Sequence, residues 1–432
     1  MMSFLNWSSN KLLSFGLRCY LVLLPWQTIF IVRTVFIQGS KWEYGTVGLY
    51  VSEIFLFALL AFAFYQKKII LKNISKSAWF LLAYVIIMMF MVRDRILVVQ
   101  SLLHAVGAVG FFLLLRSSIL SRTEIISWLV RGAVLPSILG LYQFFFQSSF
   151  TTSWLGLSFH DPSAAGSAVV VSDTLGRWLR AYGPMSHPNV FGGYLVVVIL
   201  LYLQNNFRKS WWCRSSVLII TMALVFTFSR SAWAVLILGL VILTFSIWRQ
   251  KNINDQLIDV YAVSLMVVVM ISLVFGLVQN RLLIRSASEV RSITERASGI
   301  LEAKQIIQNH LMIGVGWGNY TANLIQENPG HPGWSYQPVH LVPLLILAEW
   351  GILGLCFIVF FLYSLRKMFW QITRVREAHL FFGIFLSGFL IIALSDHYFY
   401  TSYIGNIVMV LFLYGALSTV HPHQGISQKK IG

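Results

Sequence analysis

Apolar runs long enough to cross a membrane recur along the whole chain of 432 residues. A helix needs about 20 residues to cross the roughly 30 Å hydrocarbon core of a bilayer. Charged residues make up only 11% of the chain, whereas a soluble domain has about 25%. The runs therefore predict an all-α polytopic membrane protein, with residues 1–432 forming a single integral-membrane domain.

About twelve transmembrane helices are expected. They lie near residues 11–37, 48–65, 77–92, 96–115, 124–146, 187–204, 214–229, 231–248, 258–278, 341–364, 379–395 and 402–419. An even number of spans puts both termini on the same side of the membrane.

The net charge of +17 could suggest a nucleic-acid partner, but its distribution argues against one. Much of the charge lies in short segments between helices, such as "QKKIILKNISK", "NNFRKSWWCR" and "SLRKMFWQITRVR". These segments and the tail "SQKK" fall on the side that holds both termini. By the positive-inside rule this side is the cytoplasm. We expect a multi-pass membrane protein with cytoplasmic termini, a membrane as partner and no nucleic acid.

Two connections on the outer face are long, at 147–186 and 279–340. The second precedes the tenth helix. Its apolar residues recur at helical spacing, which predicts an amphipathic helix that structures the loop; they are Ile293, Ala297, Ile300, Ile307 and Leu311. Arg296 lies at the margin of the apolar stripe of this helix. If the helix lies on the bundle or on the membrane surface, the Arg296 side chain can face that surface.

Seven arginines fall on the outer side: Arg177, Arg180, Arg230, Arg281, Arg285, Arg291 and Arg296. Arg230, in "VFTFSRSAW", is flanked by apolar helix on both sides, where an ionisable group is costly and indicates a functional site. The alternative is that Arg230 snorkels to the interface at a helix end. Because a guanidinium binds phosphate oxygens bidentately and keeps its charge, converging arginines favour a diphosphate pocket.

His340, in "YQPVHLVPLLILAEWG", ends the long loop and opens a helix. A histidine with a pKa near neutrality can take a proton from an attacking hydroxyl; the alternative is a hydrogen-bonded interfacial histidine. Glu349 lies roughly 13 Å further along the same helix, too far for direct contact with His340, so it is expected to pair within the bundle, with an arginine as one candidate partner. Asp396 and His397, at an outer helix end, are candidate supporting groups.

Metal and dinucleotide chemistry are not indicated. No cluster of Asp, Glu or His has metal-ligand spacing along the chain, so we expect no metal and no cofactor. The glycines of "GVGWGN" lack a surrounding strand–turn–helix unit and are expected to form turns. His187 and His331 lie beside prolines, where structural turns are at least as plausible as ligands.

Four segments in order resemble the O-antigen ligase and polymerase superfamily of bacterial membrane glycosyltransferases. They are "RAYGPMSHPNVFGGYLV", "TFSRSAW", "ERASGILEAKQIIQNHLMIGVGWGNY" and "HLVPLLILAEWGILGL", within a family-like catalytic region at 175–400. One departure is that Leu341 follows His340, where many relatives have an asparagine.

The resemblance implies a protein of the bacterial cytoplasmic (inner) membrane. It also implies transfer of a glycan from an undecaprenyl-diphosphate donor, at the outer leaflet and without a metal, to a glycan or lipid-core acceptor. By similarity, His340 deprotonates the acceptor, and Arg180, Arg230 and Arg296 hold the diphosphate. Attack opposite the departing diphosphate predicts an inverting reaction.

Three alternatives stay open at this point. A polymerase of the same superfamily differs from a ligase in its acceptor, and no residue decides between them, although motif spacing favours a ligase. A flippase for lipid-linked oligosaccharides would also use about twelve helices and a basic cavity, but would place polar groups near mid-membrane. A non-catalytic scaffold leaves Arg230 and His340 without a purpose.

Overall fold

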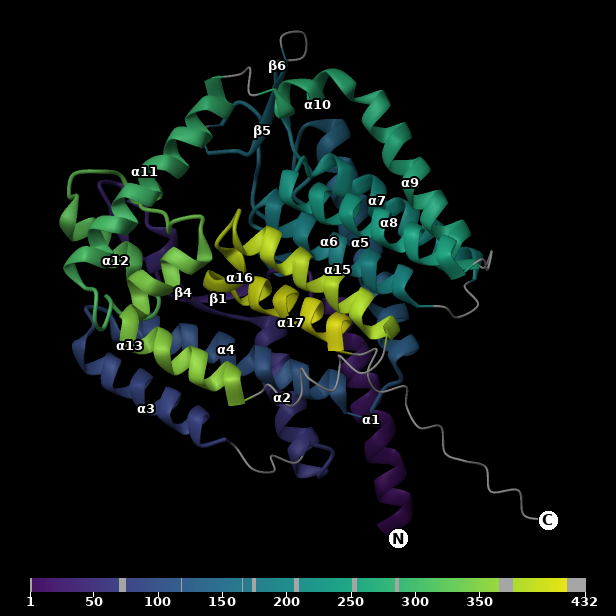
Figure 1. Ribbon diagram of the computed structural model, residues 1–432, viewed down its shortest axis with the longest axis horizontal. Helices are drawn as coiled ribbons and strands as arrows, with labels where there is room; N and C mark the ends of the chain where they lie inside the picture. Colours follow the sequence, from purple (N-terminus) through teal and green to yellow (C-terminus); the bar gives the residue numbers. More distant parts are fainter. Residues whose placement is uncertain are drawn as a thin grey trace.

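The fold is described from a computed structural model (Figure 1) over residues 2–69, 75–117, 119–164, 166–172, 176–205, 210–250, 255–283, 287–364 and 376–417. The longer helices are α1 (Met2–Leu23), α2 (Val51–Tyr65), α3 (Lys76–Met91), α4 (Arg95–Arg116), α5 (Arg122–Phe146), α6 (Pro188–Gln204), α7 (Trp211–Phe226), α8 (Arg230–Gln250), α9 (Asp255–Leu273), α11 (Ala287–Asn309), α13 (Val342–Ser364), α15 (Arg376–Ala393) and α17 (Tyr403–Leu417). Three short helices are α10 (Phe275–Leu282), α12 (Tyr320–Glu327) and α16 (Tyr398–Thr401).

The chain is mostly helical, but it is not all-α. Three two-stranded antiparallel ribbons pair β1 (Ile29–Arg33) with β4 (Val47–Tyr50), β2 (Phe36–Ile37) with β3 (Ser40–Lys41), and β5 (Val169–Ser172) with β6 (Gly176–Leu179). The expected helix 11–37 is therefore wrong in its second half. Pro25 follows the end of α1 and has no amide hydrogen to continue it, and the β-branched run that follows suits a strand.

Within the described residues, five helices (α4, α5, α8 to Trp248, α9 and α13) are long and apolar enough to cross a membrane, and six shorter apolar helices accompany them. This composition is that of a helical membrane protein. The number of twelve spans stays a prediction, as does the side on which the termini lie; the tail "SQKK" and much of "SLRKMFWQITRVR" lie outside the described residues.

Helix α6 is the centre of the bundle. Every one of its residues except Asn189 is buried, as expected for a helix that is apolar all round. It packs against α5, α7, α8 and α17. His187 caps its first turn by accepting a hydrogen bond from the Asn189 amide, and Pro188 occupies the first helical position, where its missing N–H costs nothing. The one partly exposed position of α6 therefore lies at its N-terminus.

The two long connections are structured. Helix α10 packs beside β5 at one end of the molecule, and α11 and α12 lie next to each other and to α13 (Figure 1). The predicted amphipathic helix is present as α11, which buries Ala303 and Ile306 against Tyr320, Leu324 and Val339. Its outer positions differ from the prediction, because Ile293 is exposed and Leu311 lies beyond the helix end.

Helix α13 is interrupted at Gly351, whose φ of 62° and ψ of −173° suit glycine alone. The loop 311–316 fills the interruption. Val315 N–H donates to the Ala348 carbonyl at 2.9 Å, and Ile352 N–H donates to the Leu311 carbonyl at 2.9 Å. Irregular backbone in a membrane protein needs such internal partners, so this loop is built into the bundle.

Candidate functional site

His340 lies two residues before α13, at the point where the second long loop meets the bundle. Its Nδ1 is 3.5 Å from Oδ1 of Asp396, an electrostatic contact longer than a good hydrogen bond. The His340 side chain is 29% exposed, whereas that of Asp396 is 8% exposed. The ring of His397 lies 5.0 Å from that of His340. The connection before α13, which carries His340, and the connection after α15, which carries Asp396 and His397, are 56 positions apart in sequence. They meet at the partly exposed imidazole of His340.

Asp396 is linked to Arg180 through one amide side chain. Asn189 Nδ2 donates to Asp396 Oδ2 at 2.8 Å, while Asn189 Oδ1 accepts from Arg180 at 2.6 Å. Arg180 also donates from Nε to the Thr227 carbonyl at 2.7 Å. The chain Arg180–Asn189–Asp396–His340 thus joins α6, the turn before α8 and the segment after α15.

The charge states around Asp396 follow from their surroundings. Burial alone would raise the pKa of its carboxyl, but the neighbouring imidazoles of His340, His397 and His187 hold that pKa well below its usual range. Burial lowers the pKa of His397 to about 4, against the opposing attraction of Asp396. Asp396 is therefore ionised and His397 neutral near pH 7.

Three arginines from separate elements share one small cavity. It is lined by Asn189, Arg230, Ser231, Arg281, Arg296 and Ser395. Arg230 is the first residue of α8, and Asn189 lies in the first turn of α6, so two helix N-termini add to the positive potential. The space is only about 40 Å³. A diphosphate is larger than this space, so one could bind here only if the guanidinium groups separated or if it lay at the mouth of the cavity.

The predicted arginines separate into two groups. Arg230 and Arg296 line the cavity, as does Arg281, which was counted among the outer arginines but not assigned. Arg180 is 4% exposed and lies behind Asn189. Arg177 instead donates to the Pro162 carbonyl, Arg291 pairs with Glu295, and Arg285 lies outside the described residues.

Glu349 is buried, and the partners that hold it are backbone amides and a tyrosine. It accepts hydrogen bonds from the amides of Gly318 at 3.0 Å and Tyr320 at 3.3 Å, and from the Tyr400 hydroxyl at 2.5 Å. The expected arginine partner is therefore replaced by these donors. Because Tyr400 N–H also donates to the His397 carbonyl, Glu349 ties the glycine-rich loop to the segment that carries Asp396.

Three possible metal ligands lie together at this site. One ligand atom from each of His340, Asp396 and His397 lies within 4.8 Å of the others. The spacing argument could not detect this group, because it considered ligands that are near in sequence. Much of its capacity is already used, since His397 Nδ1 contacts Thr401 Oγ1 at 2.8 Å and Asp396 accepts from Asn189.

Sequence reasoning missed Asn189 as a site residue, counted Arg281 among the outer arginines without a role, and treated His397 only as a possible supporting group beside Asp396. Asn189 lies in the quoted stretch "RAYGPMSHPN", and a polar side chain in the first turn of a wholly apolar helix is a usable signal. It also missed a buried pair far from the arginines: His104 Nδ1 lies 2.8 Å from Glu53 Oε1, between α4 and α2. This pair lies in the first 170 residues, where only the helix pattern had been compared.

Comparison with known proteins supports the predicted family. The sequence model of a family described as O-antigen ligase matches residues 215–359, about a third of the chain. No curated protein and no solved structure matches. The match bears out the resemblance to the O-antigen ligase and polymerase superfamily. The match covers less than half of the chain, so it shows that this part is similar to the O-antigen ligase family. The apolar helices independently indicate a helical membrane protein.

Proposed function

We propose that the protein transfers a glycan from a lipid-diphosphate donor, of the undecaprenyl-diphosphate type, to an acceptor hydroxyl at the outer leaflet. The observation that carries this proposal is the placement of the arginine-lined cavity beside the His340–Asp396 pair, with Asn189 common to both. One side of the site suits a diphosphate and the other a hydroxyl that must lose its proton.

The donor diphosphate binds at Arg230, Arg281 and Arg296. Guanidinium groups offer fixed pairs of donors to phosphate oxygens. Negative charge grows on the diphosphate as its bond to the sugar breaks, and positive groups already in place stabilise that charge. Arginines therefore supply the neutralisation that other glycosyltransferases obtain from a divalent metal.

His340 is the general base. The acceptor oxygen forms a bond to the anomeric carbon while the bond from that carbon to the diphosphate oxygen breaks and its electron pair leaves with the diphosphate. The acceptor proton passes to His340, and the ionised Asp396 stabilises the imidazolium. Attack from the face opposite the leaving group inverts the anomeric configuration.

Arg180 has a positioning role in this scheme, in place of the direct diphosphate contact expected from the sequence. Its two bonds, to the Thr227 carbonyl and to Asn189 Oδ1, orient the amide that holds Asp396. The carboxylate is thereby kept beside His340.

The test is transfer from purified lipid-diphosphate donor in detergent with EDTA present, using lipid-linked and envelope extracts of the source cells as donor and acceptor. We expect His340→Ala to reduce the rate about 10²- to 10⁴-fold, the usual contribution of a general base. Arg281→Lys should raise the donor KM about tenfold, because lysine keeps the charge but not the fork. Arg291→Lys, on the exposed face of α11, is the matched control and should leave both constants unchanged.

Each contrary outcome has a definite meaning. Wild-type transfer by His340→Ala overturns the general-base assignment. Transfer that EDTA abolishes and a divalent metal restores assigns His340, Asp396 and His397 as metal ligands instead. Movement of the lipid across a bilayer without transfer would make the protein a flippase, and the labelled product separates a ligase from a polymerase.

A further inference from the structure

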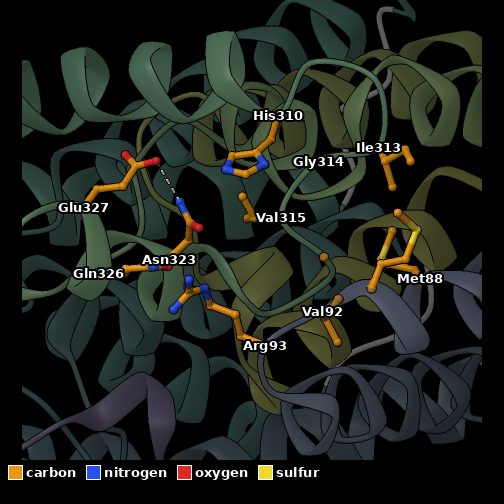
Figure 2. Close-up of a pocket in the computed structure, with 12 residues that line it drawn as sticks. Met88, Val92, Arg93, His310, Ile313, Gly314, Val315, Asn323, Gln326 and Glu327 are labelled. Atoms are coloured by element: carbon orange, nitrogen blue, oxygen red, sulfur yellow. Dashed lines mark hydrogen bonds between the residues drawn. The ribbon is translucent and has the colours of Figure 1, made fainter.

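A second cavity, of about 600 Å³, opens between the end of α3, the loop that follows α11, and α12. It is lined by Met88, Met91, Val92, Arg93, His310, Ile313, Gly314, Val315, Gly316, Asn323, Gln326 and Glu327 (Figure 2). None of these residues lines the arginine cavity. Its volume lies within the roughly 300–1,000 Å³ of ordinary small-molecule sites.

The lining divides into two halves of different polarity. Figure 2 shows Met88, Val92 and Ile313 together on one side, and Arg93, Asn323, Gln326 and Glu327 on the other. A ligand that fills both halves has an apolar part and a polar part, so the cavity suits an amphiphile.

The apolar half is continuous with the outer surface of α3. Ile87, Phe90 and Met91 are 58%, 72% and 60% exposed on this helix. Apolar residues exposed on a helix of a membrane protein face lipid. An alkyl chain can therefore pass from the bilayer into the cavity past Met91 without crossing water.

The polar half is close to charge balance. Arg93 and Glu327 have opposite charges, and the other polar groups include the amides of Asn323 and Gln326. Glu327 Oε1 accepts hydrogen bonds from the side-chain amides of Asn323 at 3.1 Å and Asn309 at 3.4 Å. Both of these bonds use the same carboxylate oxygen. This set offers donors and acceptors in similar number, which suits sugar hydroxyls. It differs from the arginine cavity, where positive charge dominates.

The cavity is preorganised by the backbone around it. Asn319 bonds the turn between α3 and α4 twice, accepting from the Asp94 amide at 2.9 Å and donating to the Asp94 carbonyl at 3.1 Å. Gly316 approaches Val92 so closely that a Cβ at this position would lie 2.0 Å from Val92 Cγ1. The two walls are therefore held at a set distance, as a binding site needs.

The same wall is attached to the helix that follows His340. Gly316 N–H donates to the Glu349 carbonyl at 2.9 Å, and Val315 N–H donates to that of Ala348. Ala348 lies eight positions after His340, and the part of this stretch in α13, from Val342 to Ala348, rises roughly 9 Å. The cavity wall and His340 are therefore joined by a short length of chain, on a scale that a saccharide of more than one ring could span.

We propose that this cavity holds an uncharged sugar unit of a membrane-anchored glycolipid, and that this glycolipid is the acceptor. The identification as acceptor rests on the proposed function; the binding of the glycolipid does not. The apolar half takes the start of the lipid chain and the polar half takes the sugar, while a further sugar hydroxyl reaches His340.

The binding test uses an alkyl β-glucoside that carries a photoreactive diazirine in its alkyl chain, added to the full-length protein in phosphatidylcholine vesicles. We expect crosslinks in the segments 88–92 and 311–315, removed by excess octyl glucoside and not by octyl phosphate. Displacement by octyl phosphate at the same concentration, or crosslinks spread evenly over the exposed apolar helices, would overturn the glycolipid assignment.

Gln326→Leu is the discriminating variant, because Gln326 is exposed and lines the polar half. Loss of its hydrogen bonds to the sugar should lower labelling about tenfold. Gln308→Leu, an exposed position on α11 outside the cavity lining, is the matched control and should label as wild type. Equal labelling of the two variants would contradict the proposal.

Two further measurements separate this inference from the proposed function. His340→Ala should label as wild type, since binding does not need the base, and a loss of labelling there would contradict the site. In the transfer assay, Gln326→Leu should raise the acceptor KM about tenfold and leave the donor KM unchanged. Labelling of the cavity without any glycan transfer would support the glycolipid site and contradict the proposed transferase function.

Discussion

Asp396 is the residue on which the proposed catalytic arrangement depends most. Its carboxylate contacts His340, accepts from Asn189 and accepts from the His397 amide at 2.8 Å. Asp396→Asn keeps the shape of the side chain but removes the charge that stabilises the imidazolium. We expect kcat to fall by about 10² or more, as when the carboxylate behind a catalytic histidine is neutralised. The measurement is kcat and donor KM for wild type and variant.

If Asp396 acts on the rate through His340 and not on donor binding, its variants should change kcat and leave donor KM nearly unchanged. Donor KM should change little in Asp396→Asn, because the arginines that bind the diphosphate are retained. Asp396→Glu should recover part of the rate, since it restores the charge at a slightly different distance. A fall in donor affinity with unchanged kcat would place Asp396 in the diphosphate site instead.

The sequence was sufficient to select candidate histidines and arginines, but not to show which of their side chains lie together in space. His340, Arg230 and Arg296 could be selected because a histidine at a helix start and arginines next to apolar helices are costly without a purpose. Arg180 and Arg230 look equivalent in sequence, yet Arg180 is buried behind Asn189 while Arg230 lines the cavity. That difference depends on how α6 packs against the turn before α8, which no local pattern encodes.

At the scale of elements, the apolar runs located the helices to within a few residues except at the first helix. There, one continuous apolar run hid the change from helix to ribbon after Pro25, because a run of apolar residues fits a buried strand as well as a helix. The interruption of α13 was also missed. A single glycine inside an apolar helix is a weak signal, and its meaning comes from the loop 311–316 that packs against it.

Gly351→Ala tests the interrupted helix. The alanine Cβ would lie 2.5 Å from the Met312 carbonyl oxygen, and its backbone would have to keep a φ of 62°. The left-handed conformation alone costs about 1–2 kcal/mol, and the contact adds to it. We expect a clear fall in Tm in detergent, with reduced transfer because the loop joins Glu349 to the site.

Gly383→Ala is the matched control in α15. A Cβ at Gly383 meets no atom within 4 Å, so alanine should be neutral or stabilising by up to about 1 kcal/mol. Equal Tm values for Gly351→Ala and Gly383→Ala would show that the loop does not constrain the interruption.

At the scale of the whole molecule, three histidines predict how stability depends on pH: His397, which is buried, and His160 and His187, which are half-buried. Burial lowers the pKa of His160 to about 4 and, with repulsion from Arg180, that of His187 to about 3; His397 is lowered to about 4. In the unfolded chain a histidine has a pKa of about 6.5. The unfolded state therefore binds more protons below that pH, and stability should be lost progressively from pH 6.5 to about 4.

Thermal unfolding in detergent between pH 7.5 and 5 measures this loss as a Tm that falls by several degrees. His160 stacks on Tyr182 with ring centroids 3.8 Å apart, so His160→Phe keeps a ring at that place and removes the titration. The variant should show a shallower fall than wild type. A Tm that is flat or that rises on acidification would contradict the burial of neutral imidazoles.

The orientation of the whole molecule is the remaining prediction, and it decides which leaflet supplies the donor. The lysine-rich connections should face the cytoplasm and the loops that carry the site should face outward. Single cysteines can test this after Cys19, Cys213 and Cys356 are replaced by alanine. Trp154, which is 87% exposed in the first long loop, and Lys67, which follows α2, are suitable positions.

In intact spheroplasts, a membrane-impermeant maleimide should label Trp154→Cys at once and Lys67→Cys only after the membrane is permeabilised. This result would put His340 and the arginine cavity at the outer leaflet, because the first long loop leads directly into α6, whose first turn carries Asn189 of the cavity. The end of that loop is also tied to α5 by the hydrogen bond from Gln143 Nε2 to the Gly183 carbonyl. The reverse pattern would put the site at the cytoplasmic leaflet, so the donor would have to react before it is flipped. Labelling of both positions in intact cells would contradict a single orientation.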